Sequence, residues 1–328
     1  MAAAKGTIAG VPAEAAAFAA VAALGAVGWA AFPDDLAFLT RLIGLTCLVL
    51  SVDLVTGYCG IATLGQSALF GVAAYASGNA ALLGAADPLA MLAAGVVAGG
   101  LAGLASGALI ARFRGLPQLV LSIAIGQLVA ALANKATAVT GGSDGLSGIE
   151  PGRVFGVFAF DLYGRTGYVL SVAVLAVVFA ALLRFVRSPF GLLCRAIKDD
   201  GLRASMIGAR VYPRLVIMYG VSGAVAGVGG ALEAINTGVV GLDGVGFERS
   251  AEALVMLVLG GAGSLWGGLC GAVVFQLFEH RVSAVNPFHW LTTVGVLLIA
   301  VVLFAPGGLG ALAAAMVRRA SLALGKRP

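Results

Sequence analysis

The sequence predicts an all-α, polytopic membrane protein with about ten transmembrane helices. Of its 328 residues, 60% are hydrophobic and only 11% are charged, and the mean hydropathy is +1.04. A soluble domain is typically about 45–50% apolar and about 25% charged. Because a transmembrane helix needs ~20 mainly apolar residues, about ten of them account for most of the apolar content. The composition therefore excludes a water-soluble enzyme of two ordinary domains.

Apolar stretches suited to membrane-spanning helices follow one another along the chain. They lie at 13–31, 36–55, 61–83, 89–110, 116–135, 167–184, 215–237, 251–260, 266–279 and 290–305. The first stretch ends in Phe32-Pro33-Asp34-Asp35 without a clear small-residue cleavage site, which favours a retained span over a signal peptide. The 49 glycines suit helices that approach closely in lipid, because small residues let two backbones meet.

The apolar region at 251–279 is interrupted by the run Gly260-Gly261-Ala262-Gly263-Ser264. One long helix, a re-entrant pair and two spans all fit this pattern. Short segments interrupted by glycine are common in transporters, and an even number of crossings keeps the basic C-terminus in the cytoplasm. We therefore expect two short or tilted spans.

The distribution of Lys and Arg predicts the orientation. With the N-terminus in the cytoplasm, most of the 20 basic residues fall on the cytoplasmic side, as the positive-inside rule requires. Residues 1–328 then form a single transmembrane domain with both termini in the cytoplasm. Its long connections are an external loop at 136–166 and a cytoplasmic loop at 185–214, and residues 313–328 form a basic cytoplasmic tail.

The sequence contains no convincing catalytic, metal or cofactor motif. Its four cysteines show no C-x-x-C spacing, its two histidines form no H-E-x-x-H, and no P-loop is present, so we expect no ATP to bind this chain. The net charge of +5 must be read by position in a membrane protein and does not predict nucleic-acid binding. An intramembrane hydrolase would need Ser147 and His280, but Ser147 lacks a complete G-x-S-x-G motif.

The cytoplasmic loop at 185–214 predicts two short helices. Ser188 suits an N-cap followed by Pro189 at the first helical position, and Gly201 suits the end of that helix. A second helix is expected from Leu202 to Ile207. Phe190, Leu193 and Ile197 share one face of the first helix, which favours a docking surface for a partner. The alternative is a basic loop that lies on anionic lipid.

Several polar side chains fall inside the apolar stretches. Those suited to a translocation path for a small polar solute are Gln66, Gln127, Asn134 and Glu233. Such a path needs hydrogen-bonding groups that do not hold the solute too tightly. For each residue, hydrogen bonding between helices is an equally good explanation. Asp53 lies near the cytoplasmic end of the second stretch, where it is either interfacial and paired with a basic loop or functional.

Five runs in the same order resemble the branched-chain amino-acid ABC permeases of the LivM type. They extend from about residue 40 to residue 312 and comprise 53–60 with 64–71, Thr140-Gly141-Gly142-Ser143-Asp144-Gly145-Leu146-Ser147-Gly148-Ile149, Arg187-Ser188-Pro189-Phe190-Gly191 with Arg195-Ala196-Ile197, Asp199-Asp200 and Gly208, then 258–267, and Phe304-Ala305-Pro306-Gly307-Gly308-Leu309. Cys59, Ile61 and the second half of the cytoplasmic loop depart from the family pattern, which leaves subfamily and substrate open.

The resemblance implies an ABC importer permease subunit in the inner membrane of a bacterium, and no enzyme. Its solute would be a branched-chain amino acid or a related small amide such as urea. The implied partners are the lipid bilayer, a second homologous permease subunit, an external solute-binding protein and two cytoplasmic ATPases, which would bind the ATP. The resemblance leaves open whether the permease pair is a heterodimer or a homodimer.

By the same resemblance, the helix at 190–200 would be the coupling helix that sits in an ATPase groove. The residues carried over are Pro189, Phe190, Gly191, Arg195, Ala196, Ile197, Asp199 and Asp200. In the external loop, Gly141, Gly142, Ser143, Asp144 and Gly145 would meet the binding protein or gate the outer mouth, unless they form only a flexible cluster of turns. The rival hypothesis is a stand-alone secondary transporter or channel, in which Glu233 or Asp53 binds a coupling ion.

Overall fold

The computed structural model describes residues 13–33, 35–153 and 164–285, together with 158, 160, 292, 293, 295, 296, 299, 303 and 308. In this part of the chain the secondary structure is helical apart from isolated bridges. The helices are α1 (Ala13–Ala31), α2 (Leu36–Val52), η1 (Asp53–Tyr58), α3 (Gln66–Leu82), α4 (Pro88–Ile110), α5 (Leu116–Lys135), α6 (Thr137–Thr140), η2 (Gly142–Asp144), α7 (Arg165–Arg187), α8 (Pro189–Met206), α9 (Val211–Thr237), η3 (Leu242–Gly244), α10 (Phe247–Gly260) and α11 (Leu265–Val285).

The all-α fold class is confirmed, and the predicted stretches from 13–31 to 266–279 each coincide with a helix. Six of the described helices are long and apolar enough to cross a membrane on their own, and α10 with α11 passes the same test as a bent pair. The number of about ten spans is therefore approximate. The predicted stretch at 290–305 and the basic tail at 313–328 lie outside the described residues, apart from isolated positions in the former.

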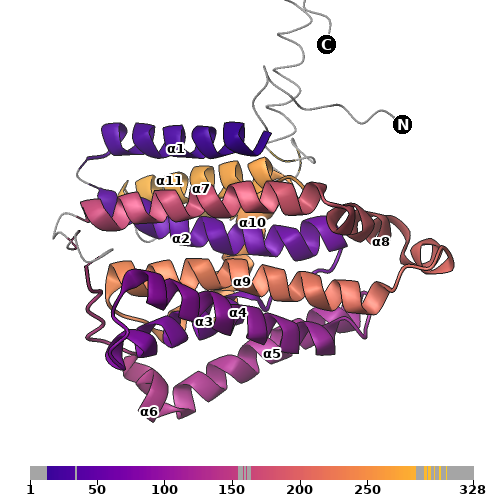
Figure 1. The fold of residues 1–328 in the computed structure, drawn as a ribbon, viewed down its shortest axis with the longest axis horizontal. Helices are drawn as coiled ribbons and strands as arrows, with labels where there is room; N and C mark the ends of the chain where they lie inside the picture. The colour runs from indigo at the N-terminus through magenta and orange to yellow at the C-terminus, as the bar shows by residue number, and fades with distance from the viewer. Residues whose placement is uncertain are drawn as a thin grey trace, which may run out of the picture.

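Helices α2 and α9 form the centre of the bundle (Figure 1). Helix α9 packs against α2, α3 and α4, while α1 packs on α7 at one side of the molecule. Most residues of α2 and α9 are buried inside the chain, so these two helices are surrounded by the other helices of the bundle. Helix α8 follows α7 at one end of the bundle, which we call the α8 end, and the opposite end is the far end (Figure 1).

The extensive contact between α4 and α9 is made largely by glycine. Gly95, Gly99 and Gly103 recur every four residues on α4 and face Gly223 and Gly227 of α9. A Cβ atom on Gly99 would lie only 2.9 Å from the Cα atom of Gly227. Because small residues allow backbones to approach closely in a membrane, this seam confirms the role predicted for the abundant glycines.

The 251–279 region contains two helices, because α10 and α11 are bent by 115° across a short break. Gly261 and Gly263 in this break have φ values of +103° and +86°, which L-residues with a side chain rarely adopt. The alternative of one long helix is therefore wrong. The expectation of two short spans rather than a re-entrant pair stays a prediction, since both fit a sharp bend between two helices.

Candidate coupling helix and polar sites

Helix α8 begins as the sequence predicts. The Ser188 backbone is extended, its side-chain oxygen accepts a hydrogen bond of 3.4 Å from the Gly191 N–H, and Pro189 occupies the first helical position. The second segment also ends as expected, since Gly208 follows it with φ at +90°. Local capping thus fixes both ends of α8, which lies in the predicted cytoplasmic loop.

The junction between the two α8 segments corrects one prediction, because Gly201 does not end the first helix. The break falls at Asp200, whose φ and ψ are −156° and 97°. Its Oδ1 atom accepts hydrogen bonds of 3.0 Å from the N–H groups of Leu202 and Arg203. Asp200 is therefore the N-cap of the second segment, and Gly201 belongs to that segment. Because the Asp200 carboxylate accepts hydrogen bonds from two helix N–H groups, the boundary falls at Asp200 rather than at Gly201.

The apolar face of α8 points into the bundle, which overturns the expectation that it forms a docking surface. Ile197 and Cys194 are buried in the main core. Phe190 is half-buried against Phe185, with ring centroids 5.3 Å apart, and Leu193 packs on the same core. The spacing correctly groups these residues on one face, but that face anchors α8 to its own chain.

The other predicted coupling residues divide between the two faces of α8. Pro189, Ala196 and Asp199 are exposed, Asp200 is half-buried, and Gly191 is buried beneath the first turn. Arg195 is exposed as a residue, but its guanidinium lies over the Tyr58 ring at 4.6 Å from the centroid. The surface free for a partner therefore includes Leu192, which is 56% exposed and lies outside the residues predicted to couple.

Helix α8 is attached to the end of α2 through η1. Lys198 donates a hydrogen bond of 2.6 Å from Nζ to the carbonyl oxygen of Gly57. Arg195 covers Tyr58 in the same π-helical turn. A single π-helical turn within a helix widens the backbone and is frequent at functional sites. Lys198 and Arg195 of α8 thus both contact η1, the turn that follows α2.

Asp53 connects η1 to the break between α10 and α11. Its side chain is fully buried, and Oδ1 accepts a hydrogen bond of 2.6 Å from the Gly263 N–H. Its Oδ2 atom has no hydrogen-bond partner within the described part of the chain. The carboxylate makes no ion pair with the basic loop, although Lys198 and Arg195 of that loop lie near enough to attract it. Asp53, Gly57, Lys198 and Gly263 together form what we call the η1 junction.

The four candidates for a translocation path do not converge. Gln66 is buried, with Oε1 at 3.2 Å from Ser222 Oγ, which also lies 2.9 Å from the Ser51 carbonyl oxygen. This contact joins α2, α3 and α9, so Gln66 fits the alternative of hydrogen bonding between helices. Gln127 and Asn134 are exposed on α5. Glu233 instead pairs with Arg249 of α10 at 3.8 Å.

The run at 140–149 is an ordered structure. Leu146 and Val240 exchange main-chain hydrogen bonds of 2.9 and 2.8 Å, and the Ile149 N–H donates to the Gly238 carbonyl at 3.2 Å. Gly141, Gly142 and Gly145 all have positive φ, as the tight path requires. Ser143 donates to Asp144 at 3.2 Å, and both side chains are exposed. The run is thus pinned to the connection after α9, which favours a fixed surface over a flexible cluster of turns.

The hydrolase hypothesis receives no geometric support. Ser147 is exposed in the pinned run, whereas the His280 ring on α11 stacks on Phe38 at 4.1 Å between centroids. Among the residues with described positions, no group of three His, Cys, Asp or Glu side chains is placed to hold a metal ion. Ser147 and His280 are therefore not brought together as the hydrolase hypothesis requires.

Comparison with known proteins identifies the family of this bundle. Residues 36–306 match the model of the family described as "Branched-chain amino acid transport system / permease component". The chain belongs to this permease family. The match spans the region from α2 to beyond α11, so it includes both α8 and the η1 junction.

Individual relatives are transport permeases. The chain is 26% identical over 300 residues to the high-affinity branched-chain amino acid transport system permease protein LivM of Escherichia coli, which covers 84% of this chain and 69% of the relative. LivM of Salmonella typhimurium is 26% identical over 287 residues, with 80% and 66% covered. The galactose/methyl galactoside import permease protein MglC of Salmonella typhimurium is 29% identical over 175 residues, with 49% and 51% covered. No solved structure matches the chain significantly.

Proposed function

We propose that this chain is the transmembrane permease subunit of an ATP-driven importer for branched-chain amino acids or related small amides. It performs no covalent chemistry, and ATP is bound by two cytoplasmic ATPase subunits. A second homologous permease completes the path, and an external binding protein delivers the solute. The importer lies in the inner membrane of a bacterium, with both termini of this chain in the cytoplasm. Family membership and the resemblance to LivM support this assignment.

The attachment of α8 to the η1 junction is the observation that carries the proposal. A coupling helix must move as a rigid body and pass its motion to the membrane helices. Capping at Ser188 supports a rigid first segment, and the buried face of Ile197 and Cys194 holds this segment on the core. Lys198 then links α8 to the end of α2, and Asp53 links that end to the bend between α10 and α11. A displacement of α8 by an ATPase is therefore transmitted to two further helical elements.

Replacing Lys198 by methionine tests this route. The substitution removes the hydrogen bond to the Gly57 carbonyl but keeps the aliphatic stem. A hydrogen bond to a charged group contributes about 1.5–3 kcal/mol, and each 1.4 kcal/mol is tenfold. We expect solute uptake per ATP hydrolysed to fall about tenfold in proteoliposomes that contain the assembled importer, while ATP hydrolysis persists. The matched control is Lys135→Met, which removes an exposed lysine at the end of α5, outside the predicted coupling segment.

An unchanged ratio of uptake to hydrolysis in Lys198→Met would contradict the coupling route. Purification of the tagged chain in mild detergent tests the rival of a stand-alone transporter. ATPase subunits should co-purify with an importer subunit. Their absence, together with ion-driven solute uptake by the chain reconstituted alone, would establish the rival instead.

A further inference from the structure

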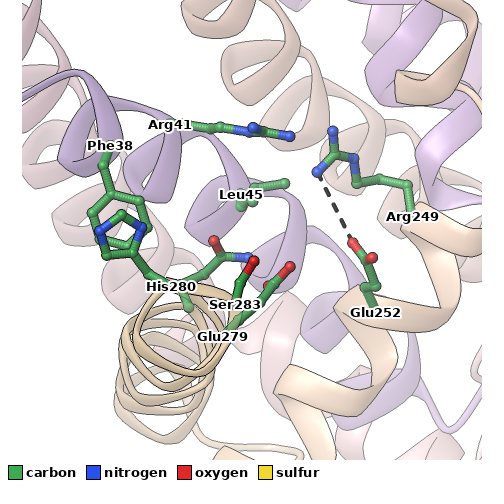
Figure 2. Close-up of a pocket in the computed structure, with 9 residues that line it drawn as sticks. Phe38, Arg41, Leu45, Arg249, Glu252, Glu279, His280 and Ser283 are labelled. Atoms are coloured by element: carbon green, nitrogen blue, oxygen red, sulfur yellow. Dashed lines mark ion pairs between the residues drawn. The ribbon is translucent and has the colours of Figure 1, made fainter. Parts of the chain in front are cut away.

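A charged cavity of about 410 Å³ lies at the far end of the bundle, away from the η1 junction. It is an open cavity bordered by the start of α2, the start of α10 and the last turns of α11 (Figure 2). A ligand pocket typically has a volume of about 300–1,000 Å³. The cavity is therefore large enough for a small solute, and neither the family assignment nor the sequence motifs account for it.

The cavity brings together two cations and two anions from three helices. Arg41 of α2 and Arg249 of α10 extend toward one another across it, and Glu252 and Glu279 lie on the α10 and α11 sides (Figure 2). Arg249 is partly neutralised by Glu252 at 4.0 Å and by Glu233 at 3.8 Å. Neither Arg41 nor Glu279 has an ion-pair partner among the residues whose positions are described. Arg41 and Glu279 still attract one another across the cavity, but neither is held in an ion pair, so a ligand that carries both charges can insert between them.

Polar and apolar groups complete the lining. The Gln276 side chain is only 7% exposed, and within the described ranges its amide makes no hydrogen bond although it borders the cavity. This amide is therefore available to form a hydrogen bond with a ligand in the cavity. Phe38 and Leu45 provide an apolar wall from α2. The lining therefore offers complementary charges, a spare amide and an aliphatic contact surface.

We propose that this cavity binds an aliphatic α-amino acid as a zwitterion. The carboxylate lies between Arg41 and Arg249, where it relieves the repulsion between two guanidinium groups that face each other. The ammonium group meets Glu279, and the aliphatic side chain packs on Phe38 and Leu45. Because Arg249 also pairs with Glu233, the cavity is linked to α9 in the centre of the bundle. The choice of an amino acid as ligand rests on the proposed function, whereas the preference for a zwitterion rests on the four charges.

Saturation-transfer difference NMR on the full chain in phosphatidylcholine nanodiscs tests this site without ATPase subunits. The probes are L-leucine, 4-methylpentanoate, which lacks the ammonium group, and 3-methylbutylamine, which lacks the carboxylate. We expect saturable binding of L-leucine in preference to both analogues. Arg41→Gln should weaken leucine binding by about tenfold, and Arg41→Lys should weaken it less. Glu279→Gln should reduce the preference for leucine over 4-methylpentanoate by about tenfold.

Arg281→Gln is the matched control, because Arg281 is also on α11 but its guanidinium lies over the Phe32 ring at 5.8 Å. This variant should bind leucine as the parent does. Equal binding of the three probes, or unchanged binding in both Arg41→Gln and Glu279→Gln, would overturn the proposal. Loss of the leucine signal in nanodiscs that contain phosphatidylethanolamine would also overturn it, because a lipid headgroup with the same two charges would then be the occupant.

Uptake measurements separate failure of this site from failure of the proposed function. If the assembled importer shows ATP-driven uptake and Arg41→Gln leaves its KM unchanged, the site is wrong and the function stands. If leucine binds in the cavity with the expected selectivity but uptake does not depend on ATP, the function is wrong and the site stands.

Discussion

The two ends of the bundle use charged residues in opposite ways. At the η1 junction, Lys198 and Asp53 each make a short hydrogen bond of 2.6 Å to a main-chain group of another element. At the far end, the ion pairs of Arg249 are 3.8 and 4.0 Å long, and they surround a cavity. Short bonds to backbone fix elements relative to one another, whereas longer pairs between flexible side chains are easily rearranged. The α8 end is therefore suited to transmitting force, and the far end is suited to binding a ligand.

We expect the largest effect from a substitution that disrupts the helix packing between the two ends. Gly99 lies in the α4–α9 seam between them, and a larger residue would force the two backbones apart. Overpacking of this kind costs about 3 kcal/mol, and more where backbone must move. We expect Gly99→Leu to abolish a monodisperse folded chain, as measured by size-exclusion chromatography in detergent. The control is Gly244→Leu in η3, because a Cβ atom on Gly244 would meet nothing within 4 Å. Gly84 is equally open, but its positive φ disfavours any side chain. Equal elution of both variants with the parent would contradict the importance of the seam.

An intermediate effect is expected at the η1 junction. Asp53→Ala leaves the Gly263 N–H buried without its acceptor, and an unsatisfied buried group costs about 1–3 kcal/mol. Unfolding in a dodecyl sulfate titration should therefore begin at lower detergent fraction. Asp53→Asn keeps an acceptor oxygen and is the control, so it should lose less stability. If the asparagine variant were as unstable as the alanine variant, charge rather than the hydrogen bond would hold the junction.

The smallest effect is expected at the cavity. Glu252→Gln removes an ion pair of 4.0 Å in which Arg249 keeps Glu233 as a partner. Arg249 is only 11% exposed, but Glu252 is 33% exposed and water can take its place, so we expect a loss of about 1 kcal/mol. The same dodecyl sulfate titration should show stability close to that of the parent. A loss of stability as large as that of Asp53→Ala would show that the ion pairs at the far end also hold the fold together. The contrast between the two ends would then be wrong.

Hydropathy and glycine content predict most of the fold. Runs of apolar residues place α1 to α5, α7 and α9 to α11, because in lipid each helix must satisfy its own backbone. Local capping signals also place the start of α8 at Ser188 and its end before Gly208. The boundary at Gly201 is wrong because two capping residues compete there. Asp is one of the preferred N-cap residues, so Asp200 is itself a signal for the start of the second segment.

The polar sites are harder to predict, because they join residues far apart in the chain. The Asp53–Gly263 hydrogen bond links positions separated by 210 residues, and no periodicity encodes such a pairing. Spacing shows that Phe190, Leu193 and Ile197 share a face, but it does not show whether that face meets the bundle or a partner. Arg41 lies in the second apolar stretch and Arg249 lies just before the eighth, far apart in the sequence. Their convergence in the cavity depends on how α2 and α10 pack.

The glycine seam between α4 and α9 has a consequence for how the bundle accommodates motion. An interface of interdigitated leucines resists displacement, because each side chain must change rotamer to leave its groove. Gly95, Gly99 and Gly103 have no side chains, so their contact with α9 is made by backbone atoms and involves no rotamer at these three positions. The close approach of α4 and α9 therefore depends on keeping glycine opposite glycine, and any relative movement of the two helices must preserve that register.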